Sequence, residues 1–216
     1  RYFKSHGVRR GDRIAGYLPN IPQATYAFLA ATSLGAIWSC CSQDFGVSSV
    51  VDRFAQIEPV LFIAADGYYY NGKTHTRLEE IDAVRKSLQS IRDTLLINYT
   101  GAIRDEVQPG ITIYDTLLEG GNEVPVFEAV PFDHPLWILY SSGTTGAPKA
   151  ITHSHGGCLL EHLKYLAFHN DVHPGERFFW YTTTGWMMWN FLHGSMMLGA
   201  TIVLYDGSPG YPDIDR

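Results

Sequence analysis

A stretch rich in hydroxyl groups and glycines follows an apolar, strand-like run in the second half of the chain. Residues 136–151 read LWILYSSGTTGAPKAI. Such a loop can bind phosphate, because hydroxyls rotate toward phosphate oxygens, glycines let backbone N–H groups come close, and a lysine adds positive charge. The groups are Ser141, Ser142, Thr144 and Thr145, then Gly143 and Gly146, and finally Lys149. The sequence therefore predicts a phosphate loop here, with a plain surface turn as the alternative.

The order of residues in this loop differs from that of a Walker A loop. A Walker A loop ends in adjacent Gly, Lys and Ser or Thr, whereas here Ala147 and Pro148 separate Gly146 from Lys149. The loop is therefore not expected to belong to a P-loop nucleoside triphosphatase.

Strand-like and helical patterns alternate along the chain, which predicts parallel βαβ units and a doubly wound α/β fold. We expect Asn20 to cap the first long helix, Gly35 to end it, and Ser48 or Ser49 to cap the next one. Prolines and glycines between 99 and 135 indicate a long connecting region. The expected strands are 13–18, 36–40, 60–64, 94–98, 136–141, 178–182 and 201–205, and the expected helices are 22–34, 48–56, 77–90, 157–168 and 186–198.

Composition narrows the class of protein. With 216 residues, of which 45% are hydrophobic, the chain can bury a sizeable core. The formal charge of −6 argues against a surface that binds duplex nucleic acid. No apolar run approaches the roughly 20 residues of a membrane span, and the first residues have no signal-peptide core. The three cysteines show no metal-type spacing and no even framework, so we expect buried, reduced thiols in a cytoplasmic protein.

The segment YSSGTTGAPKA resembles the signature YTSGTTGKPKG of the adenylate-forming superfamily, which includes acyl-CoA synthetases, luciferases and peptide-synthetase adenylation domains. Ala147 and Ala150 replace the usual Lys and Gly, but the loop glycines, the hydroxyls and Lys149 are kept. Other segments, such as DFGVSSVVDRFAQIEP and GATIVLYDGSP, resemble the branch whose members activate acetate or acetoacetate. After Gly-Trp, the acetate-activating members typically have Val-Thr-Gly-His, where this chain has Met187, Met188, Trp189 and Asn190. The resemblance thus favours the acetoacetate-activating subgroup.

This resemblance implies a two-step ligase reaction that uses ATP with Mg²⁺ and CoA as substrates. A carboxylate attacks the α-phosphate of ATP, and the CoA thiol then takes the acyl group from the acyl-AMP. The loop residues would bind the β- and γ-phosphates while charge develops on pyrophosphate. Another short-chain acid, such as acetate or propionate, and a non-catalytic nucleotide-binding fragment are the alternatives.

By the same resemblance, residues 1–216 are part of an N-terminal AMP-binding domain. We expect residues up to about 150 to form a first βα lobe that ends in the phosphate loop, and residues from about 151 to begin a second lobe. The family's adenine motif, its ribose-binding Asp and the Lys of its C-terminal domain do not occur in this sequence. The 216-residue chain alone is therefore expected to be inactive.

Two further sets of site residues are implied by the resemblance. Trp186, Met187 and Met188 follow a hydroxyl run at a strand-to-helix junction and would line the acyl pocket; packing in an apolar core is the alternative. Lys73 lies where related enzymes carry arginines that meet the nucleotide end of CoA, but Tyr69 and Tyr70 stand in for one of those arginines, which departs from the family's pattern. A solvated loop lysine is the alternative there.

Histidines near the phosphate loop invite a metal-site interpretation that the sequence does not favour. His153 and His155 have H-x-H spacing and His162 follows, but no Cys or carboxylate joins them at supporting spacing. We expect these residues to pack at a helix start or in a pocket, and we expect no metal site. Ser154 lacks the GxSxG context of a hydrolase nucleophile.

Overall fold

The computed structural model describes residues 1–104, 108–118, 124–141 and 146–214. Its main element is a sheet in the order β7-β6-β3-β1-β2-β8-β9. Neighbouring strands run parallel except β8 and β9, which are antiparallel. The mostly parallel α/β fold expected from the sequence is thus confirmed. The strands are β1 (Arg13–Tyr17), β2 (Ile37–Cys41), β3 (Leu61–Ala65), β6 (Asp93–Ile97), β7 (Ile111–Ile113), β8 (Pro135–Ser141) and β9 (Lys149–Ser154).

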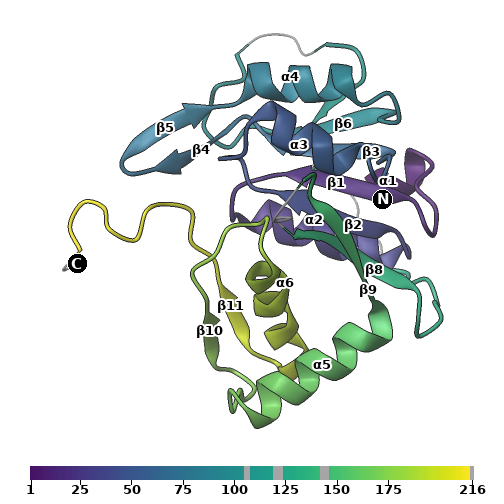
Figure 1. The fold of residues 1–216 in the computed structure, drawn as a ribbon, viewed down its shortest axis with the longest axis vertical. Helices are drawn as coiled ribbons and strands as arrows, with labels where there is room; N and C mark the ends of the chain where they lie inside the picture. Colours follow the sequence, from purple (N-terminus) through teal and green to yellow (C-terminus); the bar gives the residue numbers. More distant parts are fainter. Residues whose placement is uncertain (105–107, 119–123, 142–145, 215–216) are drawn as a thin grey trace.

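Helices cover both faces of this sheet (Figure 1). Successive residues of β1 point to opposite faces, so Ile14 joins one apolar cluster and Ala15 the other. The cluster of Ile14 contains the buried face of α2 (Pro22–Ser33) and Phe3 of the short α1 (Tyr2–Ser5). The cluster of Ala15 contains buried residues of α3 (Val47–Phe54) and α4 (Leu78–Ser87). This two-sided covering explains why β3 is a continuous apolar run rather than an alternating pattern.

A smaller unit follows β9 and lies beside the large sheet (Figure 1). Its two parallel strands, β10 (Arg177–Phe179) and β11 (Thr201–Val203), pack with α5 (His155–Phe168), α6 (Met187–Gly194) and a 3₁₀ turn, η2 (Ser195–Leu198). Trp189 of α6 is fully buried in the cluster of the large sheet. This residue therefore ties the smaller unit to the larger one.

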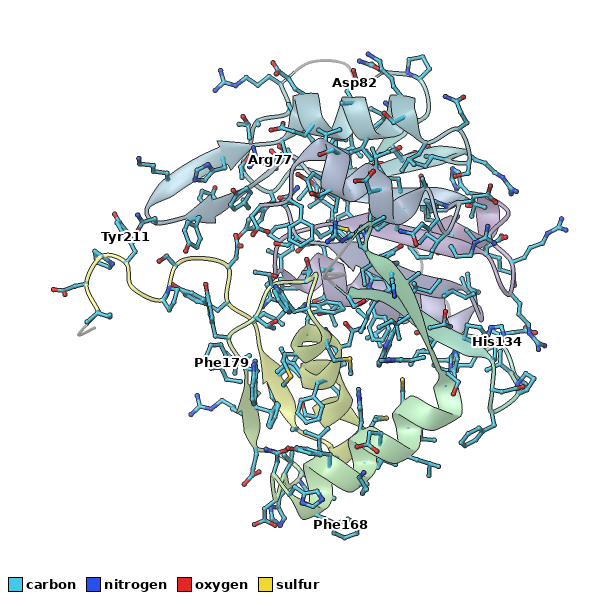
Figure 2. All side chains as sticks on the ribbon, viewed as in Figure 1. Arg77, Asp82, His134, Phe168, Phe179 and Tyr211 are labelled. Atoms are coloured by element: carbon cyan, nitrogen blue, oxygen red, sulfur yellow. The ribbon has the colours of Figure 1, made fainter. Side chains whose placement is uncertain are left out.

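An antiparallel hairpin of β4 (Gly67–Tyr70) and β5 (Lys73–Thr76) was not predicted from the sequence. Its two turn residues, Asn71 and Gly72, have φ angles of 50° and 71°. A two-residue hairpin turn with positive φ at both positions favours Asn-Gly, so a signal for this hairpin was present in the sequence. Tyr211 packs against the turn, where a Cβ on Gly72 would overlap its ring (Figure 2).

Several expected boundaries and caps were wrong. The residue before α3 is Gly46, in extended conformation and without a side-chain cap, so Ser48 and Ser49 lie inside the first turn. Asn20 does not cap α2 either, because Ile21 precedes the helix and the Asn20 side chain has tertiary partners instead. Helix α5 starts at His155, where Ser154 Oγ accepts a hydrogen bond from the Gly157 N–H.

Other differences concern element lengths. Strand β10 is shorter than the expected 178–182, and the expected helix 186–198 divides into α6 and η2. The region 99–135 contains β7 and a 3₁₀ turn, η1 (Tyr114–Leu117), which were not predicted. Gly35 ends α2 as expected, with φ +66°. Within the described ranges, no helix combines the length and the apolar character that a bilayer span requires.

Candidate functional site

A cavity of about 370 Å³ opens at the carboxyl edge of the large sheet. After β1 the chain adds β2 on one side and β3 on the other, so this edge is a topological switch point, where open α/β sheets place ligands. The segments that follow β1, β2, β10 and β11 converge on the cavity together with the β4–β5 hairpin. They contribute Pro19 and Asn20, then Ser42, Gln43 and Asp44, then Tyr181, Thr182 and Thr183, then Tyr205, Asp206 and Gly207, and from the hairpin Tyr68, Tyr69 and Tyr70.

Two of the residues that line the cavity each have a buried polar atom without a hydrogen-bond partner among the residues that the structure describes. Gln43 is 1% exposed, and its Nε2 donates to the Ala65 carbonyl while its Oε1 is unpaired. The hydroxyl of Thr183 is also buried and unpaired. Buried polar groups in native proteins nearly always have partners, so both atoms are suited to a ligand or to bound water.

The edges of the cavity are held by hydrogen bonds between the two units. Asn20 Nδ2 donates to the carbonyl of Tyr205 at 3.3 Å, and its Oδ1 accepts from Trp189 Nε1 at 3.0 Å. The Thr184 hydroxyl donates to the carbonyl of Leu18 at 2.6 Å. The residues after β1 and those before and within α6 are therefore fixed relative to each other.

The predicted phosphate loop joins two antiparallel strands rather than a strand and a helix. Ser141 at the end of β8 pairs with Lys149 at the start of β9, and Lys149 and Gly146 are exposed. The C-terminal end of α3 contacts β8, because Tyr140 Oη donates to the Arg53 carbonyl at 2.8 Å. Just after this helix, Gln56 Nε2 donates at 2.9 Å to the carbonyl of Pro148, the residue before β9. Ser142, Gly143, Thr144 and Thr145 lie outside the described residues, so their phosphate role stays a prediction.

The predicted acyl-pocket residues lie at the start of α6 and face different surroundings. Trp186 precedes the helix and is 63% exposed. Met187 packs against the apolar cluster that contains Trp137 of β8, whereas Met188 packs against the cluster of Leu166 and Phe191. None of the three lines the 370 Å³ cavity. Their pocket role also stays a prediction.

Lys73 is exposed at the start of β5, opposite Tyr70 in the hairpin. The tyrosines of this hairpin line the cavity but Lys73 does not. Arg77 (labelled in Figure 2) was not predicted as a site residue, and it joins the hairpin to the edge of the sheet. Its guanidinium donates to the Gln43 carbonyl at 2.9 Å and to Tyr68 Oη at 3.2 Å, and it pairs with Glu80 at 2.8 Å. Arg77 thus positions the backbone of Gln43 at the cavity.

The two histidines of the H-x-H segment have separate surroundings. His153 Nδ1 accepts a hydrogen bond from Trp137 Nε1 at 2.9 Å, while the His155 ring lies 5.6 Å from that of His134. Burial lowers the pKa of His153, of His155 and of His162. Within the described part of the chain, no three His, Cys, Asp or Glu side chains are placed to hold a metal ion.

Comparisons with known proteins agree on one family. A family model described as "AMP-binding enzyme" matches residues 1–216. The acetoacetyl-coenzyme A synthetase of Rhizobium meliloti (strain 1021) is 50% identical over 97% of this chain, and malonamoyl-CoA synthetase vrtB of Penicillium aethiopicum is 40% identical over 94%. A solved structure of acetoacetyl-CoA synthetase from Streptomyces lividans matches 99% of the chain with a TM-score of 0.94 and 54% identity. The chain spans 32%, 29% and 32% of these proteins, respectively. The chain belongs to the family of AMP-binding enzymes.

Proposed function

We propose that the protein containing this chain activates acetoacetate and transfers it to CoA. The observation that carries this proposal is the likeness of nearly the whole chain to acetoacetyl-CoA synthetases in both sequence and structure. The loop that follows β8 supports it, because its hydroxyls, glycines and Lys149 suit a phosphate chain. A cytoplasmic setting is part of the proposal, since Cys40, Cys41 and Cys158 are buried and unpaired.

The proposed reaction has two balanced steps. A carboxylate oxygen of the acid attacks the α-phosphorus of MgATP, the bond to the bridging oxygen breaks, and pyrophosphate leaves. The CoA sulfur then attacks the carbonyl carbon of the acyl-AMP, the thiol proton is released, and AMP departs with the former carboxylate oxygen. The loop hydroxyls and Lys149 would stabilise the charge that grows on pyrophosphate.

We propose the cavity at the carboxyl edge as a place for part of CoA. Its tyrosine-rich wall offers apolar faces, and Gln43 Oε1 and the Thr183 hydroxyl are free to pair with amide or amine groups. Lys73 lies on the hairpin whose tyrosines form this wall, so its ammonium is available for a phosphate at the cavity entrance. A charge-reversing Lys73→Glu change should raise the KM for CoA and leave the KM for ATP unchanged.

We propose that the acid bound by this protein has a carbonyl at its third carbon. The names of the two curated relatives denote acetoacetyl and malonamoyl groups, and both of these groups have such a carbonyl. Acetate and propionate lack it. Trp186, Met187 and Met188 would form the apolar wall of the acyl pocket, because methionine side chains adapt to short, irregular acyl groups.

Acid-dependent exchange of labelled pyrophosphate into ATP, measured without CoA in the full-length protein, tests this function. The proposal predicts exchange with acetoacetate at a kcat/KM well above that for acetate or propionate. Exchange with acetate alone would assign the protein to another short-chain acid. The absence of exchange with any acid, in a folded protein that binds ATP, would indicate a non-catalytic nucleotide-binding role.

A further inference from the structure

Asn190 on α6 is a buried amide whose polar atoms are both unused. The residue is 1% exposed, and neither Oδ1 nor Nδ2 has a hydrogen-bond partner among the described residues. An amide can take part in up to four hydrogen bonds, so this is a large unmet capacity in the interior. Leaving such a group unpaired destabilises a folded protein, and each case in a native structure requires a reason.

The other buried polar side chains of α6 have hydrogen-bond partners. His193 Nε2 lies 2.8 Å from the Thr25 hydroxyl, and its Nδ1 lies 2.7 Å from the Trp189 carbonyl. The Trp189 indole donates to Asn20. Asn190 is therefore the exception on a helix whose other buried polar groups are paired, and packing alone would be served as well by leucine.

The position of Asn190 relates it to the predicted acyl pocket. Residues three and four apart lie on the same face of a helix, so Asn190 lies one turn beyond Met187 and next to the stripe that begins at Trp186. The step from Met187 to Asn190 is roughly 4.5 Å along the helix axis. An acid that rests against Met187 would therefore lie within one helical turn of the amide.

Nearby hydroxyls are less available for the substrate. Thr184 Oγ1 already donates to the Leu18 carbonyl, and Thr182 Oγ1 donates to the Thr183 carbonyl. The Thr183 hydroxyl is free but lines the separate 370 Å³ cavity. Only Asn190 combines deep burial, two free atoms and a place on the face of Met187, within the part of the chain that the structure describes.

We propose that Asn190 determines specificity by recognising the carbonyl at the third carbon of the acid. Its Nδ2 donates to that carbonyl oxygen. When the acid ends in a carboxamide, Oδ1 of Asn190 also accepts from the N–H of that carboxamide. The same side chain therefore serves both a methyl ketone and a carboxamide. This inference rests on the proposed function, because it assumes that a carboxylic acid is activated at this end of α6.

The test compares acids and variants in the full-length protein. The acids are acetoacetate, malonic monoamide and butyrate, which has the same chain length but no carbonyl at the third carbon. The variants are Asn190→Leu, which keeps the branched outline of the side chain in a somewhat larger group without polar atoms, and Asn190→Asp, which keeps the shape but removes the N–H donor. Met197→Leu, on the partly exposed turn η2, is the matched control.

The proposal predicts that both Asn190 variants reduce the ratio of kcat/KM for acetoacetate over butyrate by at least 30-fold, because a site built for a hydrogen bond discriminates far more strongly than an apolar one. Butyrate itself should change by less than threefold, and the control should change neither value. Asn190→Leu should unfold at the same or a higher temperature than the parent when no acid is bound, because it removes an unpaired amide.

Two results would overturn the inference. One is an unchanged acetoacetate-to-butyrate ratio in a folded variant whose unfolding temperature is also unchanged, which would make Asn190 a packing residue. The other is an unchanged ratio with a lower unfolding temperature of Asn190→Leu, which would assign the amide to a buried water. If Asn190→Leu does not fold, Asn190→Asp gives the same comparison. A parent enzyme that does not activate acetoacetate refutes the proposed function itself, whereas an active parent with an unaffected ratio refutes only the role of Asn190.

Discussion

The indole N–H of Trp189 donates a 3.0 Å hydrogen bond to Asn20 Oδ1, which joins α6 to the end of β1. Both residues are buried, and the Asn20 amide also donates to the carbonyl of Tyr205 beyond β11. One side chain thus connects three segments that meet at the carboxyl edge of the large sheet. The relative placement of α6 and the cavity depends on this connection.

Replacing Asn20 by Ala should lower the free energy of unfolding by about 1–3 kcal/mol, because the buried Trp189 N–H would lose its acceptor. Urea denaturation of the full-length protein measures this change. Trp189→Phe keeps most of the ring and removes the donor, so the double variant should be less destabilised than the sum of the two single variants. Additive effects would show that the two side chains are not energetically coupled.

Replacing Thr144 and Thr145 together by Val should reduce adenylation far more than stability. Hydroxyls aimed at phosphate act where charge develops, so we expect a loss of about 2–4 kcal/mol in transition-state stabilisation, read from kcat/KM for pyrophosphate exchange. Thr152→Val, on the exposed part of β9, is the control and should leave exchange intact. Exchange within about twofold of the parent would make the loop a structural turn.

Exchanging Met187 and Met188 for Val and Thr should shift the ratio of kcat/KM between acetoacetate and acetate toward acetate. These positions correspond to the Val-Thr that typically follows Gly-Trp in the acetate-activating subgroup. Met197→Val, on η2, is the control because its side chain is 44% exposed. If the double variant folds and adenylates with an unchanged ratio, the two methionines are core residues only.

Stability should decrease in acid because of His193. Burial lowers the pKa of His193 to about 4 from its ordinary value of 6.5. The unfolded chain therefore binds a proton between pH 6.5 and 4 that the folded protein does not, so the stability present above pH 6.5 is lost as the pH falls toward 4. His193 alone would contribute about 3 kcal/mol of this loss.

Urea titrations between pH 7 and 4 measure this dependence. His193→Gln should flatten the curve, whereas His169→Gln, an exposed histidine after α5, should leave it unchanged. A slope that is the same in the parent and in His193→Gln would show that His193 does not control the acid sensitivity.

The sequence predicted the parts of the fold that have strong local signals, such as apolar runs and helix-ending glycines. Strands such as β3 are continuous apolar runs and α2 ends at a glycine, so both could be located. The caps were less predictable, because Asn20 has stronger tertiary partners in Trp189 and Tyr205 than a helix end offers. The order of strands and the antiparallel pairing of β9 depend on contacts across the sheet, which periodicity does not encode.

The candidate site also combines features that could be recognised in the sequence with features that could not. The loop between β8 and β9 could be singled out because its hydroxyls, glycines and lysine are concentrated in a short run of sequence, and its phosphate role stays a prediction. Arg77 and Gln43 were missed, since their importance comes from a contact between a hairpin and the end of β2. The unpaired amide of Asn190 could not be recognised either, because an unpaired atom is a property of its three-dimensional surroundings.

The fate of the carboxylate oxygen tests the central claim most directly. Full-length protein is incubated with MgATP, CoA and acetoacetate labelled with ¹⁸O in its carboxylate, and the products are analysed by mass spectrometry. Activation through an acyl-AMP predicts acetoacetyl-CoA, pyrophosphate and AMP with one ¹⁸O atom in its phosphate. Formation of ADP, or of AMP without the label, would contradict the account.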